Sequence, residues 1–137
     1  GATRVIGELY PFGFGLSYTT FAYSDLEVSP LRQRTQGEYT VKVNVTNTGK
    51  RTGDEVVQLY VRDKVSSVIT YDSQLRGFER ISLKPGETRQ VTFSLKPEDL
   101  QILDRNMNWT VEPGEFEVMI GASSQDIRLK KTITALP

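Results

Sequence analysis

The clearest pattern in the chain is an alternation of apolar and polar residues. Between Tyr39 and Thr46, four apolar side chains alternate with four polar ones. Period 2 is the repeat of a β-strand, so this segment is predicted to have one buried and one exposed face. Weaker alternation predicts further strands at 23–28, 89–96, 115–121 and 127–134, with a short one around 78–81. Residues 55–62 are apolar on both sides, which predicts a strand covered on both faces.

Turn signals separate these segments. Lys84-Pro85-Gly86-Glu87 has the type II pattern, and Pro113-Gly114 repeats it. Segments 31–37 and 63–74 are predicted loops, 97–100 a single helical turn, and 104–108 the tip of a hairpin between 102–103 and 109–111. About seven or eight strands with turns roughly every 8–12 residues indicate an all-β, immunoglobulin-like (fibronectin type III-like) β-sandwich.

A stretch near the N-terminus has neither strand nor helix periodicity. Residues 10–21 hold five aromatic residues, two glycines and one proline, and carry no charge. We call this stretch the aromatic strap, and we expect its rings to be buried against another apolar surface, because residues 1–9 are too few to cover them. The predicted docking residues are Tyr10, Phe12, Phe14, Tyr18 and Phe21. The chain is accordingly divided into a linker at 1–22 and a sandwich domain at 23–137.

Composition excludes several classes of function. Seventeen basic and seventeen acidic residues cancel, so no overall field favours nucleic acid or an anionic membrane. No apolar run approaches the roughly 20 residues that span a bilayer, and residues 1–9 do not resemble a signal peptide. Without cysteine, a disulfide framework, a thiolate metal site and a cysteine nucleophile are all excluded.

Candidate chemistry is sparse. The chain has no histidine, which removes the usual general base and every Ser-His-Asp triad. Glycoside hydrolysis needs two facing carboxylates, whereas those here are expected in turns or on outward strand positions (Asp54, Glu87, Asp104, Asp126, Glu115 and Glu117). We predict no catalytic residue, no cofactor and no metal site. Segment 104–108 is the nearest approach to a calcium loop, but a plain hairpin tip explains it better.

Aromatic residues could also form a platform for sugars. The candidates are Trp109, Tyr60, Tyr71 and Tyr39. Core packing is the competing interpretation, because a sandwich of this length needs large side chains to cover its interior.

Several motifs resemble one known family. The run Leu9-Tyr10-Pro11-Phe12-Gly13-Phe14-Gly15-Leu16-Ser17-Tyr18-Thr19 is similar to the linker that joins the catalytic domains of family 3 glycoside hydrolases to a C-terminal fibronectin type III-like domain. Further similar runs follow in the family's order: Val45-Thr46-Asn47-Thr48-Gly49, Gly53-Asp54-Glu55-Val56-Val57, Leu75-Arg76-Gly77-Phe78-Glu79 and Pro113-Gly114-Glu115-Phe116. Phe14 stands where many relatives carry histidine or tyrosine.

The resemblance implies a non-catalytic accessory domain of a β-glucosidase or β-xylosidase that degrades carbohydrate. Its partners would be the upstream catalytic domains of the same polypeptide, which would carry the catalytic residues, and the implied location is secreted or periplasmic. A carbohydrate-binding or cell-surface module, with an oligosaccharide or polysaccharide as partner, is the alternative. Catalysis by this chain itself is disfavoured by the absence of histidine and of a plausible carboxylate pair.

Overall fold

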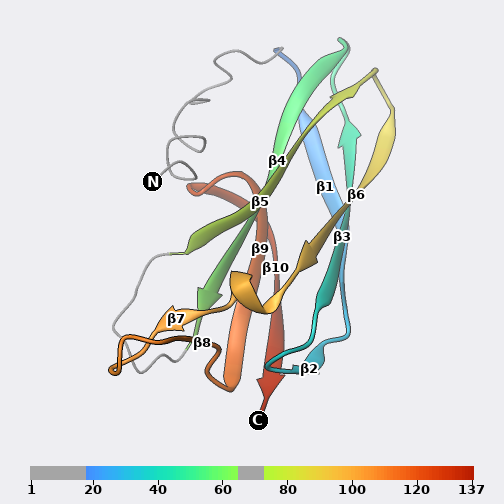
Figure 1. Ribbon diagram of the computed structural model, residues 1–137. Coiled ribbons are helices and arrows are strands. Elements are labelled where there is room, and N and C mark those ends of the chain that lie inside the picture. The colour runs from blue at the N-terminus through green and yellow to red at the C-terminus, as the bar shows by residue number, and fades with distance from the viewer. Residues whose placement is uncertain (1–17, 65–72) are drawn as a thin grey trace.

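The computed structural model describes residues 18–64 and 73–137, and in these the chain forms a β-sandwich (Figure 1). One sheet has three strands in the order β1 (Phe21–Ser29), β3 (Tyr39–Asn47) and β6 (Thr88–Leu95). The other has five, in the order β2 (Arg32–Arg34), β10 (Asp126–Leu136), β9 (Gly114–Ser123), β4 (Gly53–Asp63) and β5 (Gln74–Leu83). The predicted fold class is confirmed. The described residues form ten strands, more than the seven or eight predicted, because three of the ten are only two or three residues long.

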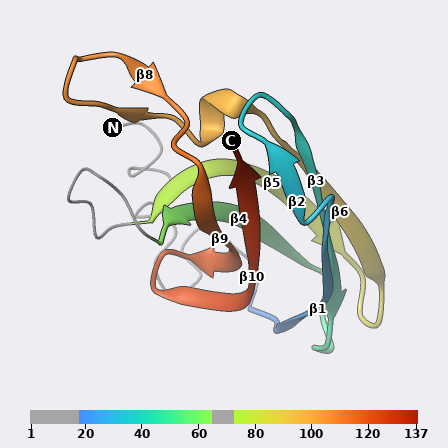
Figure 2. The same ribbon diagram turned by 90° about the horizontal axis from the view of Figure 1, so that it is seen from below.

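The predicted alternation places the core correctly. Tyr39, Val41, Val43 and Val45 of β3 are all buried, and they face Val57 and Leu59 of β4 and Phe116, Val118 and Ile120 of β9. Burying one such side chain stabilises the fold by about 1.5–3 kcal/mol. Figure 2 shows the two sheets curving around this interior. With no cysteine in the chain, contacts between the sheets hold the sandwich together.

Strand β4 is covered on both faces, as predicted. On its outer face, Gln58 is fully buried and its side-chain nitrogen donates to the Ala122 carbonyl oxygen at 2.9 Å. Ala122 lies in β9, two residues before the β9–β10 turn at 124–125. Tyr60, Leu75 and Met119 form a small second hydrophobic cluster there, with Ile127 of β10 packed against it.

Some predicted boundaries and turns need correction. The predicted loop at 31–37 contains β2, which pairs in parallel with β10 at residues 134–136. The predicted strand around 78–81 extends over all of β5, because β5 pairs with β4 along nearly its whole length. At Pro113-Gly114 the predicted type II turn is wrong: Gly114 has φ 143° and already lies in β9. The turn at Lys84–Glu87 is confirmed by Gly86 with φ 79° and by the Glu87 N–H donating to the Lys84 carbonyl oxygen at 2.9 Å.

The antiparallel registers define two ends of the sandwich. At what we call the linker end, residues 18–21 enter beside the β3–β4 turn (48–52) and the β5–β6 turn (84–87). The hairpin end, opposite, has β7 (Ile102–Leu103) and β8 (Trp109–Thr110), preceded by the predicted helical turn, a 3-10 helix η2 at Pro97–Asp99. Figure 1 shows the linker end at the top and the β7–β8 hairpin at the bottom. In the residues that the structure describes, no helix has the length and apolar character needed to cross a membrane.

Candidate functional site

The linker end is organised around one buried polar side chain, Asn47. The residue continues the inward positions of β3, so its amide lies in the interior, and it is fully buried. The amide oxygen accepts hydrogen bonds from the Thr19 hydroxyl at 2.8 Å and the Gly49 N–H at 2.9 Å. The amide nitrogen donates to the carbonyl oxygens of Arg51 at 2.7 Å and Leu83 at 2.9 Å. The Asn47 side chain thereby joins Thr19 of the incoming chain to the β3–β4 turn and to the end of β5. All four hydrogen-bonding positions of its amide are used.

The main chain around Asn47 completes the anchor. The Asn47 N–H donates to the Glu87 carbonyl oxygen at 3.0 Å, and the Gly86 N–H donates to the Asn47 carbonyl oxygen at 2.8 Å. The Thr48 N–H donates to the Thr20 carbonyl oxygen at 2.9 Å, and the two threonine hydroxyls lie 2.7 Å apart. A Cβ on Gly49 would lie only 1.9 Å from the Thr19 hydroxyl oxygen, so glycine lets the incoming chain approach this closely.

A second cluster joins the two sheets beside the anchor. Arg128 of β10 pairs with Asp126 at 2.7 Å, donates to the Phe21 carbonyl oxygen at 3.0 Å and lies 5.1 Å from the ring centroid of Tyr23. The Tyr23 hydroxyl donates to the carboxylate of Glu55 at 2.9 Å. Strand β1 is an edge of its sheet, and β2 pairs with β10 only at residues 134–136, so these side-chain contacts join the two sheets where no backbone hydrogen bonds do.

Burial sets the electrostatics of this cluster. Glu55 is buried, and desolvation raises the pKa of its carboxyl, although the Tyr23 hydroxyl and the charge of Arg128 oppose the rise. Desolvation, reinforced by Glu55, also raises the pKa of Tyr23. The hydrogen bond from Arg128 lowers the pKa of Asp126 and raises that of Arg128 itself. The cluster is a structural network of ion pairs and hydrogen bonds.

The structure describes two of the five predicted docking residues, and these two differ in exposure. Tyr10, Phe12 and Phe14 lie outside the described residues. Tyr18 stands just before the anchor with 86% of its side chain exposed. Phe21 is partly buried and packs against the main core as the first residue of β1. An exposed tyrosine held by a rigid neighbouring backbone suits contact with another surface, whereas Phe21 already contributes to this domain.

The carboxylates expected in turns or facing outward are engaged in local structure. Asp54 lies in β4 and Asp126 in β10, which corrects their predicted place in turns; they pair with Arg80 and Arg128. Glu87 accepts from the Lys84 N–H, Asp104 accepts from the N–H groups of Asn106 and Asn108, and Glu117 pairs with Arg62 at 3.2 Å. Residues 104–108 therefore form a self-bonded hairpin tip. Among the described residues, no three His, Cys, Asp or Glu side chains gather as metal ligands.

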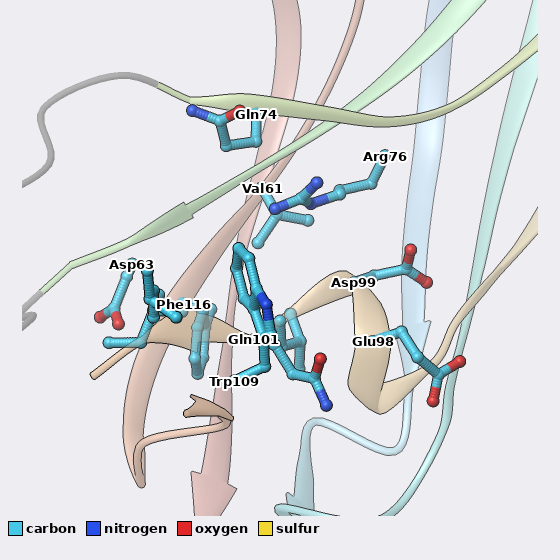
Figure 3. Close-up of a pocket in the computed structure, with 12 residues that line it drawn as sticks. Val61, Asp63, Gln74, Arg76, Glu98, Asp99, Gln101, Trp109 and Phe116 are labelled. Atoms are coloured by element: carbon cyan, nitrogen blue, oxygen red, sulfur yellow. The ribbon is translucent and has the colours of Figure 1, made fainter. Parts of the chain in front are cut away.

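Of the four candidates for an aromatic platform, three lie in described residues, and one of these is exposed. Tyr39 and Tyr60 are buried, and Tyr71 lies outside the described residues. Trp109, in contrast, is 66% exposed and lines a pocket of about 530 Å³ at the hairpin end (Figure 3). The pocket lies between the ends of β4, β5 and β9 and the segment from η2 to β8. We refer to it as the Trp109 pocket.

Asn47 and Glu55 are the important residues that sequence reasoning did not single out. A signal for both was present. Asn47 continues the inward series Tyr39, Val41, Val43 and Val45, and Glu55 precedes the inward Val57 and Leu59 by the same period. A polar residue in register with a buried face needs a partner, which is the clue that could have identified the network. The partners Thr19, Arg51 and Arg128 could not have been read from the pattern.

Comparison with known proteins identifies the domain. The family model described as "Fibronectin type III-like domain" matches residues 55–124, which hold β4, β5, β6 and β9. The chain belongs to this family. It is 53% identical over 122 residues to a β-xylosidase of Formosa agariphila and 46% identical over 122 residues to a periplasmic β-glucosidase of Salmonella typhimurium. It covers 17% and 16% of those relatives, in each case with 89% of its own length.

Solved structures agree with these relatives. A β-glucosidase of Erythrobacter marinus superposes with a TM-score of 0.84 at 42% identity, over 93% of this chain and 17% of that one. A GH3 β-glucosidase of Bifidobacterium adolescentis gives 0.80 at 36% identity, over 92% of this chain and 18% of that one. The resemblance to the fibronectin type III-like domain of family 3 enzymes is therefore confirmed. In those β-glucosidases this domain is a non-catalytic part, and their catalytic domains lie elsewhere in the chain.

Proposed function

We propose that this fibronectin type III-like domain is an accessory domain of a family 3 glycoside hydrolase of β-glucosidase or β-xylosidase type, and that it stabilises or positions the catalytic domains. The observation that carries the proposal is the anchor at Asn47, which fixes the backbone of Thr19 and Thr20 while leaving Tyr18 86% exposed. A connection fixed in this way has a defined direction, so the domain and whatever precedes it are held in a limited range of orientations.

The proposed partner surface is formed by the aromatic strap. Tyr18, which is 86% exposed, would dock onto the upstream domains, and Tyr10, Phe12 and Phe14 would dock beside it, because an exposed apolar ring gains by burial against a neighbour. Phe21, the last residue of the strap, begins β1 and packs against the core of the sandwich. The parent enzyme would remove β-linked glucose or xylose, with every catalytic residue upstream of this domain.

The test replaces Phe12, Phe14 and Tyr18 with serine in the full-length protein and in the 137-residue chain. We expect the full-length variant to lose several degrees in Tm, because exposed hydroxyls replace rings buried between domains, while the 137-residue variant keeps its own Tm. Phe78→Ser is the matched control, since Phe78 is a 50% exposed aromatic residue that belongs to β5 and not to the strap. A triple variant as stable as the full-length parent would refute docking.

The proposed location is secreted or periplasmic. One relative that matches over 89% of this chain is a periplasmic β-glucosidase. Fractionation of the native host, with an antibody against the domain, tests this directly: recovery in the culture medium or periplasm is expected, and recovery with the cytoplasmic markers would contradict it.

A further inference from the structure

The Trp109 pocket holds a large exposed aromatic side chain beside a cavity. The indole is 66% exposed although it belongs to β8, and the cavity beside it has a volume of about 530 Å³. That volume falls within the usual range of small-molecule sites, about 300–1,000 Å³. In Figure 3 the ring extends from β8 toward Val61 and Arg76.

The lining combines an apolar base with planar polar side chains and with three acidic residues, Asp63, Glu98 and Asp99, which disfavour an anionic ligand. Val61, Leu100 and Phe116 are buried residues of the core and supply the base. Gln74 and Arg76 come from the start of β5, and Gln101 follows η2. The Arg76 Nε is buried without a hydrogen-bond partner among the described residues, so part of the polar capacity of this wall is unused by the fold.

These groups match the apolar face of a sugar ring and the hydroxyl groups around its edge. The C–H bonds on one face of a pyranose ring carry partial positive charge and pack well on the electron-rich face of an indole. The hydroxyl groups around the ring both donate and accept, as the amides of Gln74 and Gln101 do, while the guanidinium of Arg76 donates to hydroxyl oxygen. An apolar peptide or a lipid would use the indole but would leave these amides and the guanidinium unpaired at a cost.

We propose that the Trp109 pocket binds a neutral oligosaccharide, with one sugar ring stacked on Trp109 and its hydroxyls bonded to Gln74, Arg76 or Gln101. The site lies at the hairpin end, opposite the place where residues 18–21 enter, so the anchor at Asn47 and the sugar site use different ends of the sandwich (Figure 1). The domain then has a binding function of its own, in addition to the accessory role proposed above and independent of it.

The composition of the chain makes this directly measurable. Trp109 is the only tryptophan in the 137 residues, so fluorescence excited at a wavelength where the six tyrosines absorb little reports this site alone. Cellohexaose, xylohexaose and laminarihexaose are titrated separately up to about 10 mM, enough to detect millimolar affinity. We expect a saturable change in intensity with a shift of the emission to shorter wavelength for at least one of them. No saturable change with any of the three would overturn the proposal.

Variants connect the signal to the geometry. By calorimetry, Trp109→Ala should weaken binding of the responding sugar at least tenfold, and Gln101→Ala about threefold to tenfold, because each removes one contact class. Phe78→Ala, which removes an exposed aromatic outside the pocket, should bind as the parent does, and circular dichroism should show all three folded. Retained affinity in Trp109→Ala would overturn the assignment. So would a pocket that becomes inaccessible to the sugar in the full-length protein, since upstream domains would then be its occupant.

Discussion

The two ends of this sandwich differ in how far their polar and aromatic side chains are buried and hydrogen-bonded within the domain. At the linker end, Asn47 is fully buried and its amide makes four hydrogen bonds, and Arg128 and Glu55 are engaged by neighbours from other strands. At the hairpin end, Trp109 is 66% exposed and the Arg76 Nε is buried without a hydrogen bond among the described residues. The difference indicates that one end is built to be rigid, whereas the other keeps interaction capacity available.

The largest expected effect is at Asn47. Asn47→Ala leaves four buried or part-buried partners without their hydrogen bonds, so we expect a loss of about 3–5 kcal/mol in the free energy of unfolding, measured by urea denaturation of the 137-residue chain. Asn44→Ala is the matched control, because Asn44 lies on the same strand and makes one exposed bond, to Asp25 at 3.1 Å. If both variants lose equally little, the linker end is not rigidified by Asn47 and the contrast between the ends fails.

Arg128 tests the closure between the sheets. Arg128→Ala removes the ion pair with Asp126, the stacking on Tyr23 and the bond to the Phe21 carbonyl oxygen. We expect a loss of about 1–2 kcal/mol. Hydrogen exchange should locate this loss of stability. The amides of β1 and of the part of β10 near Arg128 should exchange faster, whereas those of β7 and β8 should change little. Arg62→Ala, which breaks a half-exposed pair with Glu117, should cost under about 1 kcal/mol.

Glu55 gives the linker end a pH dependence. Because burial raises its pKa above the ordinary 4.5, the folded state holds the proton more tightly than the unfolded chain. Its contribution to stability is thus fully present below about pH 4.5 and is lost as pH rises through the raised value. In Glu55→Gln this loss is absent, so the stability difference between the variant and the parent should shift in favour of the variant between pH 4 and pH 7, as followed by thermal unfolding. A pH-independent difference would show that Glu55 titrates as an exposed carboxyl does.

Opposite behaviour is expected for Asp54 and Asp126 at more acidic pH. Pairing with arginine lowers both pKa values below the ordinary 3.8. Their stabilisation is present above that value and is lost as pH falls through the lowered pKa, so it does not overlap the window in which Glu55 acts.

The smallest effect is expected at the hairpin end. Trp109→Ala should change the free energy of unfolding by no more than about 0.5 kcal/mol, since the side chain is mostly exposed and β7 and β8 are only two residues long. Denaturation under the conditions used for Asn47→Ala makes the comparison direct. A loss of several kcal/mol would mean that the indole is a structural residue, and it would undermine its role as a sugar platform.

Much of the fold was predictable because its core strands show their burial in the residue pattern. The faces of β3 and β9 and the two-sided cover of β4 follow from period 2 alone, and the Pro85-Gly86 turn follows from backbone preferences. Pairing between distant segments was not predictable in this way. β2 is a polar tripeptide that becomes a strand only because residues 134–136 offer it an edge, and β5 extends because β4 lies beside it.

The candidate sites also contain some features that the sequence predicts and others that depend on segments distant in the chain. Composition identified the strap, resemblance identified the family, and the residue pattern placed Trp109 beside a hairpin. Whether an aromatic side chain packs inside or faces solvent depends on neighbours far away in the chain: Tyr39 donates to the Thr134 carbonyl oxygen 95 positions later and is buried, whereas Trp109 is 66% exposed.

The amino-acid sequence by itself determined the all-β class, the alternating core and the family, because these depend on short-range periodicity and on motifs that are continuous in the chain. Only the tertiary structure decided that Asn47 links Thr19, Arg51 and Leu83, that Arg128 closes the gap between β1 and β10, and that Trp109 stands over a cavity. These features arise where segments that are distant in sequence meet, and the geometry of such a meeting depends on how the whole sandwich packs.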